Sequence, residues 1–175
     1  KRAEERRIAA DKQRIADSKP TVKEEFHSNG KLKSRTNFQP KSDGGKKHGL
    51  SETYQETGEI RRKWFYKNGN RHGLQEQYFK NGQVWIASNF VDGLKEGIEE
   101  WFHSNGKVSD TGNWKDGKKE GLHLAYYKNG KLSYKQHYVR GKKEGIEEGY
   151  RENGRLRFKL CYINNRKVDM NNCQQ

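Results

Sequence analysis

Hydrophobic and polar residues alternate along most of this chain, in short runs separated by glycine. In the copy that spans residues 129–152, Leu132 and Tyr134 share one parity before a glycine turn. Ile146 and Tyr150 share one parity after that turn. Because alternation with period two is typical of strands, the copy predicts two short antiparallel strands joined by a turn.

The same unit recurs every 24 residues, and glycine marks the repeat most clearly. Three glycine columns have this spacing: Gly58, Gly82, Gly106, Gly130, Gly154; Gly69, Gly93, Gly117, Gly141; and Gly73, Gly97, Gly121, Gly145. An earlier copy carries Gly30, Gly45 and Gly49, displaced by an insertion after Phe38. A fixed period of this length predicts a repeat array, in which each unit stacks only on its neighbours.

Four columns of large residues are expected to share one face of the sheet. They are Leu32, Ile60, Val84, Val108, Leu132, Leu156; Phe38, Tyr66, Phe90, Trp114, Tyr138, Tyr162; Val22, Leu50, Leu74, Ile98, Leu122, Ile146; and Phe26, Tyr54, Tyr78, Phe102, Tyr126, Tyr150. A slip of one residue would turn half of them to water, so the pattern predicts the hairpin register that keeps them together. That register has a three-residue loop ending at Gly154, in the left-handed conformation, and pairs Tyr150 with Leu156.

The predicted fold is mainly β: a single-layer, coiled antiparallel meander of about twelve strands, built from hairpin repeats over residues 20–163. Only 29% of the residues are hydrophobic, too few for a two-layer core, so burial should be shallow. Residues 1–19 are charged, rich in alanine and free of glycine, which favours a short N-terminal helix. Residues 164–175 are expected to form a C-terminal cap tail, because Asn165 and Asp169 replace the next turn glycines.

The net charge of +14 favours anionic partners. An acidic protein and an anionic membrane surface are the partners that we expect, and nucleic acid is less favoured. The alternative interpretation is that the charge only keeps a thin sheet in solution. No apolar run approaches the roughly 18 residues of a membrane span.

The two cysteines, Cys161 and Cys173, lie near the C-terminus, with neither a CxxC pair nor a histidine cluster. A metal site is therefore not expected. A disulfide that pins the tail to the last strand is physically sensible. Since disulfides persist in oxidising compartments, the pair favours the bacterial periplasm or the cell surface, with the cytoplasm as the alternative.

Catalytic patterns are not visible, so we expect no enzyme activity and no cofactor. His48 and His72 share one turn slot, and His27 and His103 share another, which indicates turn positions. An acidic row on the aromatic face consists of Glu24, Glu52, Glu76, Glu100 and Glu148. Neighbouring members should lie about 10 Å apart, because their strands are two apart. Each glutamate is therefore expected to pair within its own repeat.

Bulky residues that break the repeat are the candidate partner-binding site: Phe65, Phe79, Trp85, Trp101 and His103. The predicted register places them on the face opposite the four columns, with Trp85 between Gln77 and His103 and with Trp101 opposite Ala87. An aromatic cluster among polar residues is typical of binding hot spots. One alternative is that the N-terminal helix or a second molecule covers these residues. The other is that their positions have no function.

The stretch from Tyr126 to Leu132, followed by Gly141 to Gly145, resembles the MORN-repeat variant of bacterial YwqK-type proteins, and the resemblance covers residues 21–163. Members of that family are often described as antitoxins, and similar arrays as immunity proteins encoded beside secreted effectors. MORN repeats in general are linked to phospholipid binding and scaffolding. The resemblance thus implies a non-catalytic protein that occludes a bacterial toxin, and its alternative is a peripheral membrane or scaffold module.

Overall fold

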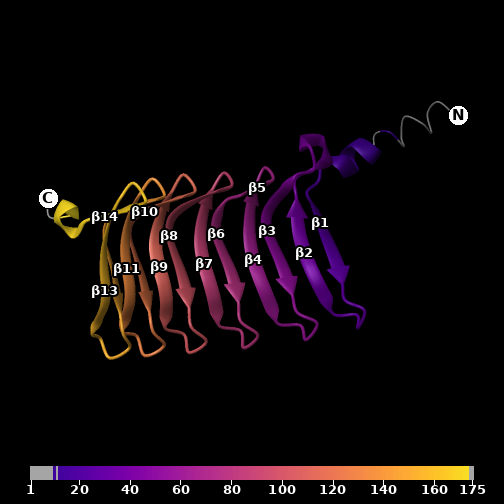
Figure 1. Ribbon diagram of the computed structural model, residues 1–175. Helices are drawn as coiled ribbons and strands as arrows, with labels where there is room; N and C mark the ends of the chain where they lie inside the picture. Colours follow the sequence, from indigo (N-terminus) through magenta and orange to yellow (C-terminus); the bar gives the residue numbers. More distant parts are fainter. Residues whose placement is uncertain (1–9, 11, 174–175) are drawn as a thin grey trace, which may run out of the picture.

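The computed structural model describes residue 10 and residues 12–173, and its strands form one open antiparallel sheet, a meander of fourteen strands (Figure 1). The strands follow one another in chain order, except that β5 pairs only with β4. Their bounds are β1 Thr21–Phe26, β2 Leu32–Phe38, β3 Lys47–Tyr54, β4 Ile60–Lys67, β5 Asn70–Arg71, β6 Gly73–Tyr78, β7 Val84–Val91, β8 Leu94–Phe102, β9 Val108–Lys115, β10 Lys118–Tyr126, β11 Leu132–Val139, β12 Lys142–Tyr150, β13 Leu156–Ile163 and β14 Arg166–Val168. The predicted meander is confirmed, and the very short β5 and β14 add to the twelve expected strands.

The Asn-Gly hairpins close as predicted. Tyr150 pairs with Leu156, and Gly154 has a φ of 86°, the left-handed conformation that glycine adopts without strain. At each of these hairpins one residue is extra, because Gly149 pairs with Phe158 while Tyr150 pairs with Leu156. The extra residues form a column of their own: Lys33, Arg61, Trp85, Ser109, Ser133 and Arg157.

The prediction that the four columns share a face is wrong, and this bulge is the reason. The extra residue interrupts the alternation, so the column that contains Phe90 and Trp114 lies on the opposite side of the sheet from the other three columns. We call the side that carries Phe90, Ser88 and Glu99 the inner face, since cross-strand pairing places these residues together. The outer face carries the other three columns and the acidic row.

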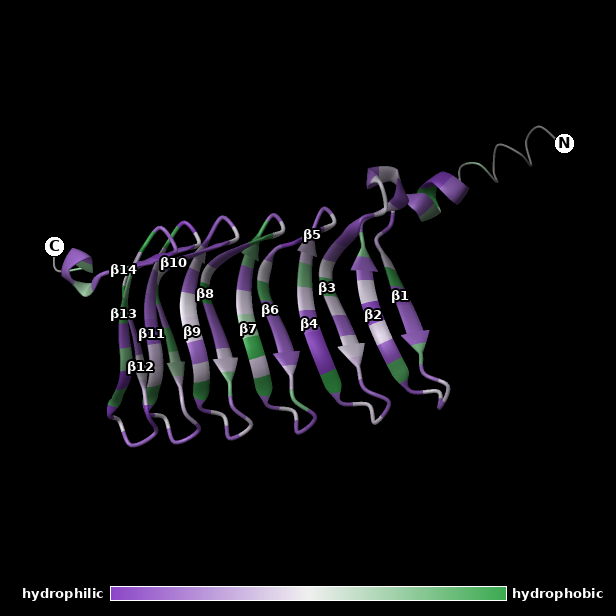
Figure 2. Ribbon diagram, viewed as in Figure 1, coloured by the Kyte–Doolittle hydropathy of each residue, from purple (hydrophilic) through white to green (hydrophobic). Residues whose placement is uncertain are grey.

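Burial is concentrated on the inner face. Ile86 and Phe90 are 6% and 7% exposed, and Gln136 is fully buried. On the outer face Ile98 and Leu122 are 61% and 52% exposed. Figure 2 shows hydrophobic and hydrophilic residues alternating along the strands, as the period-two pattern predicts. The only buried hydrophobic residues of the described chain are Ile86, Phe90 and Cys161, so the core is shallow.

The two ends of the array are different. Residues 12–17 are helical and lie at the β1 end, where Asp17 forms an ion pair with Lys41 of the 3-10 turn η1 (Lys41–Asp43) (Figure 1). The remaining part of the predicted helix, residues 1–9 and 11, lies outside the described residues. At the other end β14 is followed by η2, Met170–Cys173.

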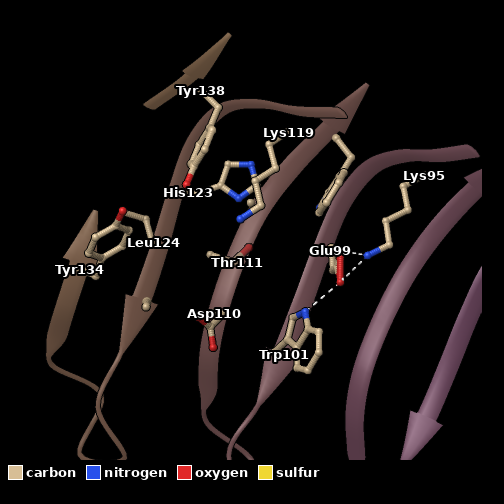
Figure 3. A pocket seen from close by; sticks show the side chains of 13 residues that line it. Lys95, Glu99, Trp101, Asp110, Thr111, Lys119, His123, Leu124, Tyr134 and Tyr138 are labelled. Carbon is tan, nitrogen blue, oxygen red and sulfur yellow. Dashed lines mark hydrogen bonds and ion pairs between the residues drawn. The ribbon is translucent and has the colours of Figure 1, made fainter. Parts of the chain in front are cut away.

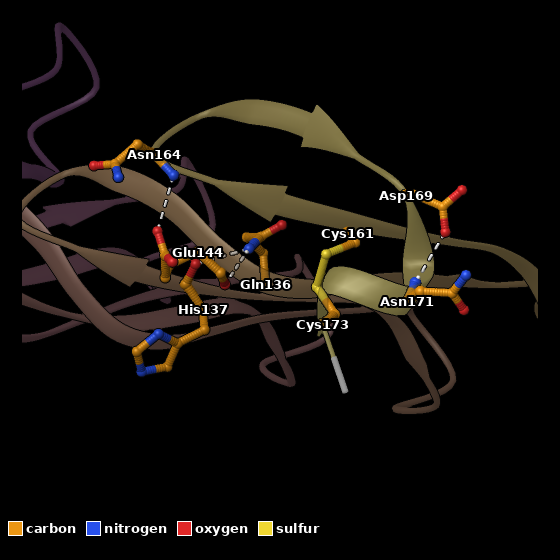
Figure 4. The surroundings of a disulfide bond; sticks show 8 residues. All are labelled: Gln136, His137, Glu144, Cys161, Asn164, Asp169, Asn171 and Cys173. Carbon is orange, nitrogen blue, oxygen red and sulfur yellow. Dashed lines mark hydrogen bonds between the residues drawn. A yellow bond between two sulfur atoms is a disulfide. The ribbon is translucent and has the colours of Figure 1, made fainter. Parts of the chain in front are cut away.

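The C-terminal tail is fastened to β13 by a disulfide between Cys161 and Cys173 (Figure 4). The two Cα atoms are 5.9 Å apart, and Cys161 is fully buried. Asn165 occupies the slot of a turn glycine with a φ of 69°. Asparagine tolerates this left-handed conformation better than most residues, so the last hairpin still forms although its glycine is missing.

Candidate binding face

The inner face carries a basic column with the period of the repeat. Its members are Lys47, Arg71, Lys95, Lys119 and Lys143. Each cation lies 4.4 to 5.1 Å from the centre of an aromatic ring on a neighbouring strand. The pairs are Lys47 on Tyr66, Arg71 on Trp64, Lys95 on Trp114, Lys119 on Tyr138 and Lys143 on Tyr162. These contacts are within the range of cation–π attraction and hold the charges against the sheet.

A buried polar row lies beside the basic column: Ser51, Gln75, Glu99, His123 and Glu147. Glu99 accepts a hydrogen bond of 2.8 Å from Lys95, four residues earlier, and another of 2.8 Å from the indole of Trp101. Glu147 repeats the arrangement two repeats later, with Lys143 at 2.9 Å. The two carboxylates offset two of the five cations, so the row leaves net positive charge on this face.

Glu147 is ionised despite its burial. Burial raises the pKa of Glu147, but hydrogen bonds from Tyr134 at 2.6 Å and from Lys143 outweigh it and leave the pKa below its ordinary value. Burial together with the bond to Glu147 raises the pKa of Tyr134. Tyr134 therefore stays protonated and donates to the carboxylate.

His123 takes the place that a carboxylate has in two other repeats. Its ring lies over Gly112 of the neighbouring strand, where an added Cβ would come within 2.0 Å of the imidazole. Nε2 is 2.9 Å from the carbonyl oxygen of Asn113, and burial lowers the pKa of the ring. The imidazole packs edge-on to Tyr138 at 4.9 Å, so it is a neutral part of the inner face at pH 7.

The inner face is hollowed in two places. One hollow, of about 510 Å³, lies over β8 to β11 and is lined by Lys95, Trp101, Trp114, Lys119, Tyr134 and Tyr138, among others (Figure 3). The other, of about 420 Å³, lies over β1 to β4 and is lined by Lys33, Lys47, Arg61, Arg62, Trp64 and Tyr66, among others. Both combine basic and aromatic side chains, which suits an anionic surface.

Three of the five predicted site residues come together. Phe79 and Trp85 have ring centres 5.9 Å apart, and Trp85 meets Trp101 edge-on at 5.5 Å. We call these three residues the aromatic cluster. Trp85 is 39% exposed and is the extra residue of its hairpin, a slot that is basic or serine in the other copies. Trp101 also lines the larger hollow, so the cluster adjoins it.

The other two predicted residues lie elsewhere. Phe65 is on the outer face, where it pairs with Leu50 and is 42% exposed. His103 lies in a hairpin loop, and its Nε2 is 2.8 Å from the carbonyl oxygen of Tyr126 in the next hairpin. Phe65 therefore belongs to a different surface, and His103 has the turn role that its repeated slot indicates.

The predicted pairing of the aromatic cluster is wrong by one residue. Trp101 pairs with Ile86, while Ala87 pairs with Glu100, and Trp85 is unpaired between the partners of Gln77 and Tyr78. The bulge is again the reason, because it shifts one strand against the other. The two tryptophan rings are still in contact, because β7 and β8 are neighbouring strands and an indole is large enough to span a one-residue offset.

The acidic row lies on the outer face, and four of its members, Glu24, Glu52, Glu76 and Glu148, pair within their own repeats as predicted. Tyr54 donates to Glu52 at 2.9 Å. Glu148 accepts from Tyr150 and lies 2.7 Å from Lys135 and 3.2 Å from Lys159. The hydrogen bond from Lys135, followed by that from Tyr150, lowers the pKa of Glu148 to about 2. These carboxylates neutralise cations of the outer face, which leaves the inner face as the more basic surface.

Sequence reasoning missed the basic column. Its 24-residue spacing could have revealed it, as the same spacing revealed the glycines. Among residues 10 and 12–173, no group of three or more histidine, cysteine, aspartate or glutamate side chains could hold a metal ion. Within the same described part of the chain, no helix is long and apolar enough to span a membrane.

Comparison with known families finds six matches to the family described as MORN repeat variant, at residues 22–39, 47–68, 71–92, 95–116, 119–140 and 143–164. The matches cover most of the chain, and their boundaries follow the hairpin repeats. MORN repeats point to a module that binds proteins or membrane lipids. No curated protein matches the chain.

Two solved structures share a remote likeness with the chain. A mutant of S. aureus TarM in complex with fondaparinux, α-GlcNAc-glycerol and UDP has 14% identity and a TM-score of 0.37, over 78% of this chain and 23% of that one. The GtfA/B complex bound to UDP and GlcNAc has 13% identity and a TM-score of 0.29, over 65% of this chain and 22% of that one. This chain thus spans less than a quarter of those chains, and at these scores the likeness carries no argument about function.

Proposed function

The chain belongs to the MORN repeat variant family, and from this premise we propose that it is a non-catalytic binding protein that neutralises a bacterial toxin or secreted effector by direct occlusion. The proposed partner surface is acidic and docks on the inner face. The observation that carries the proposal is the basic column on aromatic rings, which runs from β3 to β12. The bacterial antitoxin role comes from the resemblance of the repeat sequence.

The geometry of the inner face supports occlusion of a large surface. A single rigid sheet presents side chains in fixed rows, and a standard protein interface buries roughly 1,600 Å² in total. The basic column would speed the capture of an acidic partner through electrostatic steering. The aromatic cluster at the rim of the larger hollow supplies the kind of residue that dominates interface energies.

The disulfide between Cys161 and Cys173 supports a location in an oxidising compartment, the periplasm or the cell surface. An immunity protein acting there would meet a secreted effector before the effector reaches its target. The cytoplasm is the alternative location. Mass spectrometry of the protein taken directly from cells, with free thiols alkylated first, measures whether the disulfide is formed.

The first experiment is co-purification of the protein with the product of the adjacent gene, together with expression of that product alone. We expect the neighbour to be toxic by itself and to bind this protein. Lys119→Glu on the inner face should weaken binding by at least tenfold, about 1.4 kcal/mol. The matched control is Lys80→Glu, an exposed lysine in the β6–β7 loop, which should bind as wild type. A neighbour that is harmless, or that does not bind, contradicts the proposal.

The aromatic cluster provides the second test. Trp85→Ala and Trp101→Ala should each weaken binding by more than about 1 kcal/mol, the usual hot-spot threshold, and leave folding nearly intact. Calorimetric titration measures the affinity, and thermal melting measures the stability. Wild-type affinity in both variants would exclude the cluster from the interface, and unfolding of both would assign the tryptophans a structural role.

A peripheral membrane module is the second candidate function. The basic column and the partly exposed Trp85 favour it, because cations and tryptophan suit the headgroup region of anionic lipid. Sedimentation with vesicles of pure phosphatidylcholine and of phosphatidylcholine with phosphatidylserine distinguishes it from occlusion. Binding only to the anionic vesicles at low salt supports this function, and equal or absent binding removes it.

A further inference from the structure

The two edges of the sheet are protected to very different degrees. At the C-terminal edge, β14 is only three residues long and the disulfide-linked turn η2 follows it. At the N-terminal edge, β1 pairs with no described strand except β2, and all six of its residues are exposed within the part of the chain that the structure describes. The described helical residues lie beyond the start of β1, not along its open side (Figure 1). Unpaired backbone groups on an open edge are a template for another strand.

We propose that β1 pairs antiparallel with β1 of a second copy of this chain, about a two-fold axis that passes through Glu24. In this register Lys23 lies opposite Glu25 of the second copy, and Glu25 opposite its Lys23. Val22 lies opposite Phe26 of the second copy, and Phe26 opposite its Val22. The strand is thus complementary to itself at four of the five paired positions.

The charged pairs carry the first part of the argument. Opposite charges directly across two strands stabilise a sheet. Lys23 and Glu25 already lie near each other within β1, 3.4 Å apart, on the same face. The two-fold axis places the Lys23 and Glu25 of one copy against the Glu25 and Lys23 of the other, so each cation lies between two carboxylates. Glu24 meets its own copy at the axis, where each carboxylate is bound to Arg35 at 2.7 Å, so the like charges are offset.

The apolar pairs carry the second part. Val22 and Phe26 are 57% and 58% exposed, among the most exposed large hydrophobic residues of the described chain. Phe26 belongs to an outer-face column whose other members, such as Tyr54 and Tyr126, are only half-exposed. A second β1 would cover Phe26 as a neighbouring strand covers those residues, and would place Val22 against its ring. Cross-strand pairs of an aromatic with a β-branched residue are among the favourable pairs in sheets.

Neighbouring registers are less favourable. A shift by one residue would join the inner face of one copy to the outer face of the other, which a two-fold axis perpendicular to the sheet forbids. The register centred on Lys23 would oppose Lys23 to itself and Val22 to Glu24. Charge and hydrophobicity therefore select the register centred on Glu24. This register would join the inner faces of the two copies into one continuous surface. That surface would carry the basic columns of both copies.

The test is the mass of the full-length protein as a function of concentration, by analytical ultracentrifugation. The monomer mass is 20.5 kDa. Because one strand pair is a small interface, we expect dimers to form at about 10 µM to 1 mM. Lys23→Glu and Glu25→Lys should each weaken self-association at least tenfold, since each opposes like charges across the axis. The matched control is Glu152→Lys, an exposed glutamate in the β12–β13 loop, which should dimerise as wild type.

Mixing the two variants gives the decisive measurement. Lys23→Glu and Glu25→Lys chains are complementary at both positions, so an equal mixture should form a heterodimer although neither variant forms a homodimer. This result also shows that both variants are folded. A wild-type monomer up to about 1 mM overturns the proposal. So does a wild-type dimer that both variants retain, or a mixture that stays monomeric.

Discussion

The two faces of the sheet contradict the simple rule that apolar residues are inside. The inner face buries polar groups, with Gln136 fully buried and Glu99 4% exposed. The outer face leaves Leu74, Ile98 and Leu122 between 43% and 61% exposed. In a single layer no second sheet covers either side, so burial depends on how the side chains of one face pack against one another. Hydrophobicity along the chain therefore does not identify the inside of such a fold.

The difference between the faces also separates their chemistry. On the outer face, a tyrosine donates to a glutamate of the same strand in three repeats, as Tyr78 does to Glu76 at 2.7 Å. On the inner face, cations lie on aromatic rings and line two hollows. Adjacent residues can belong to either system: Glu147 pairs with Lys143 on the inner face, and Glu148 with Lys135 on the outer face.

The largest predicted effect compares one apolar residue from each face. Phe90→Ala should lower the free energy of unfolding by about 3–4 kcal/mol, because the ring is buried against Arg71 and neighbouring strands. Ile98→Ala should cost about 1 kcal/mol or less, since its side chain is mostly exposed. Urea denaturation measures both. Equal losses would show that the two faces are equally buried in solution.

A smaller effect concerns a glycine of the inner face whose missing side chain leaves room for an aromatic ring of the neighbouring strand. Gly149→Ala should cost about 2–3 kcal/mol, because the new Cβ would lie 2.2 Å from the ring of Phe158. The backbone at Gly149 does not need glycine, so the cost should come from the ring alone. In the Phe158→Ala background the same change should therefore be nearly neutral, and a double-mutant cycle checks this non-additivity. An undiminished cost in that background would contradict the ring contact.

The smallest effect tests the outer-face ion cluster by its pH dependence. The folded pKa of Glu148 is lowered from 4.5 to about 2, so its contribution to stability is present above pH 4.5 and is lost as the pH falls toward 2. Glu148→Gln should cost about 1–2 kcal/mol at pH 7. The variant should also lose less stability than wild type between pH 4.5 and pH 2, as measured by urea denaturation across that range. Parallel pH profiles would show that Glu148 titrates normally.

Much of the fold was predictable because the same turn residues and the same period-two alternation recur in every copy of the repeat. The Asn-Gly hairpins, the register of Tyr150 with Leu156 and the meander itself all follow from local turn chemistry and period two. The candidate site was predicted in part. Phe79, Trp85 and Trp101 meet, because β7 and β8 are neighbours and Phe79 directly follows β6, but Phe65 lies on the other face. The basic column was visible in the sequence only to a reader who follows lysine and arginine at the repeat spacing.

The sequence by itself determined the period, the strand order, the turns and the charge of this protein, since each depends on residues close together in the chain. The tertiary structure decided which residues share a face. One extra residue at each hairpin, such as Trp85 or Arg157, reverses the parity of the strand that follows. Nothing in the local alternation marks that residue as unpaired, because a bulge is defined by the strand across from it. Each hollow of the inner face is likewise lined by residues of four strands, so the surface on which the proposed function depends could not be read from any one repeat.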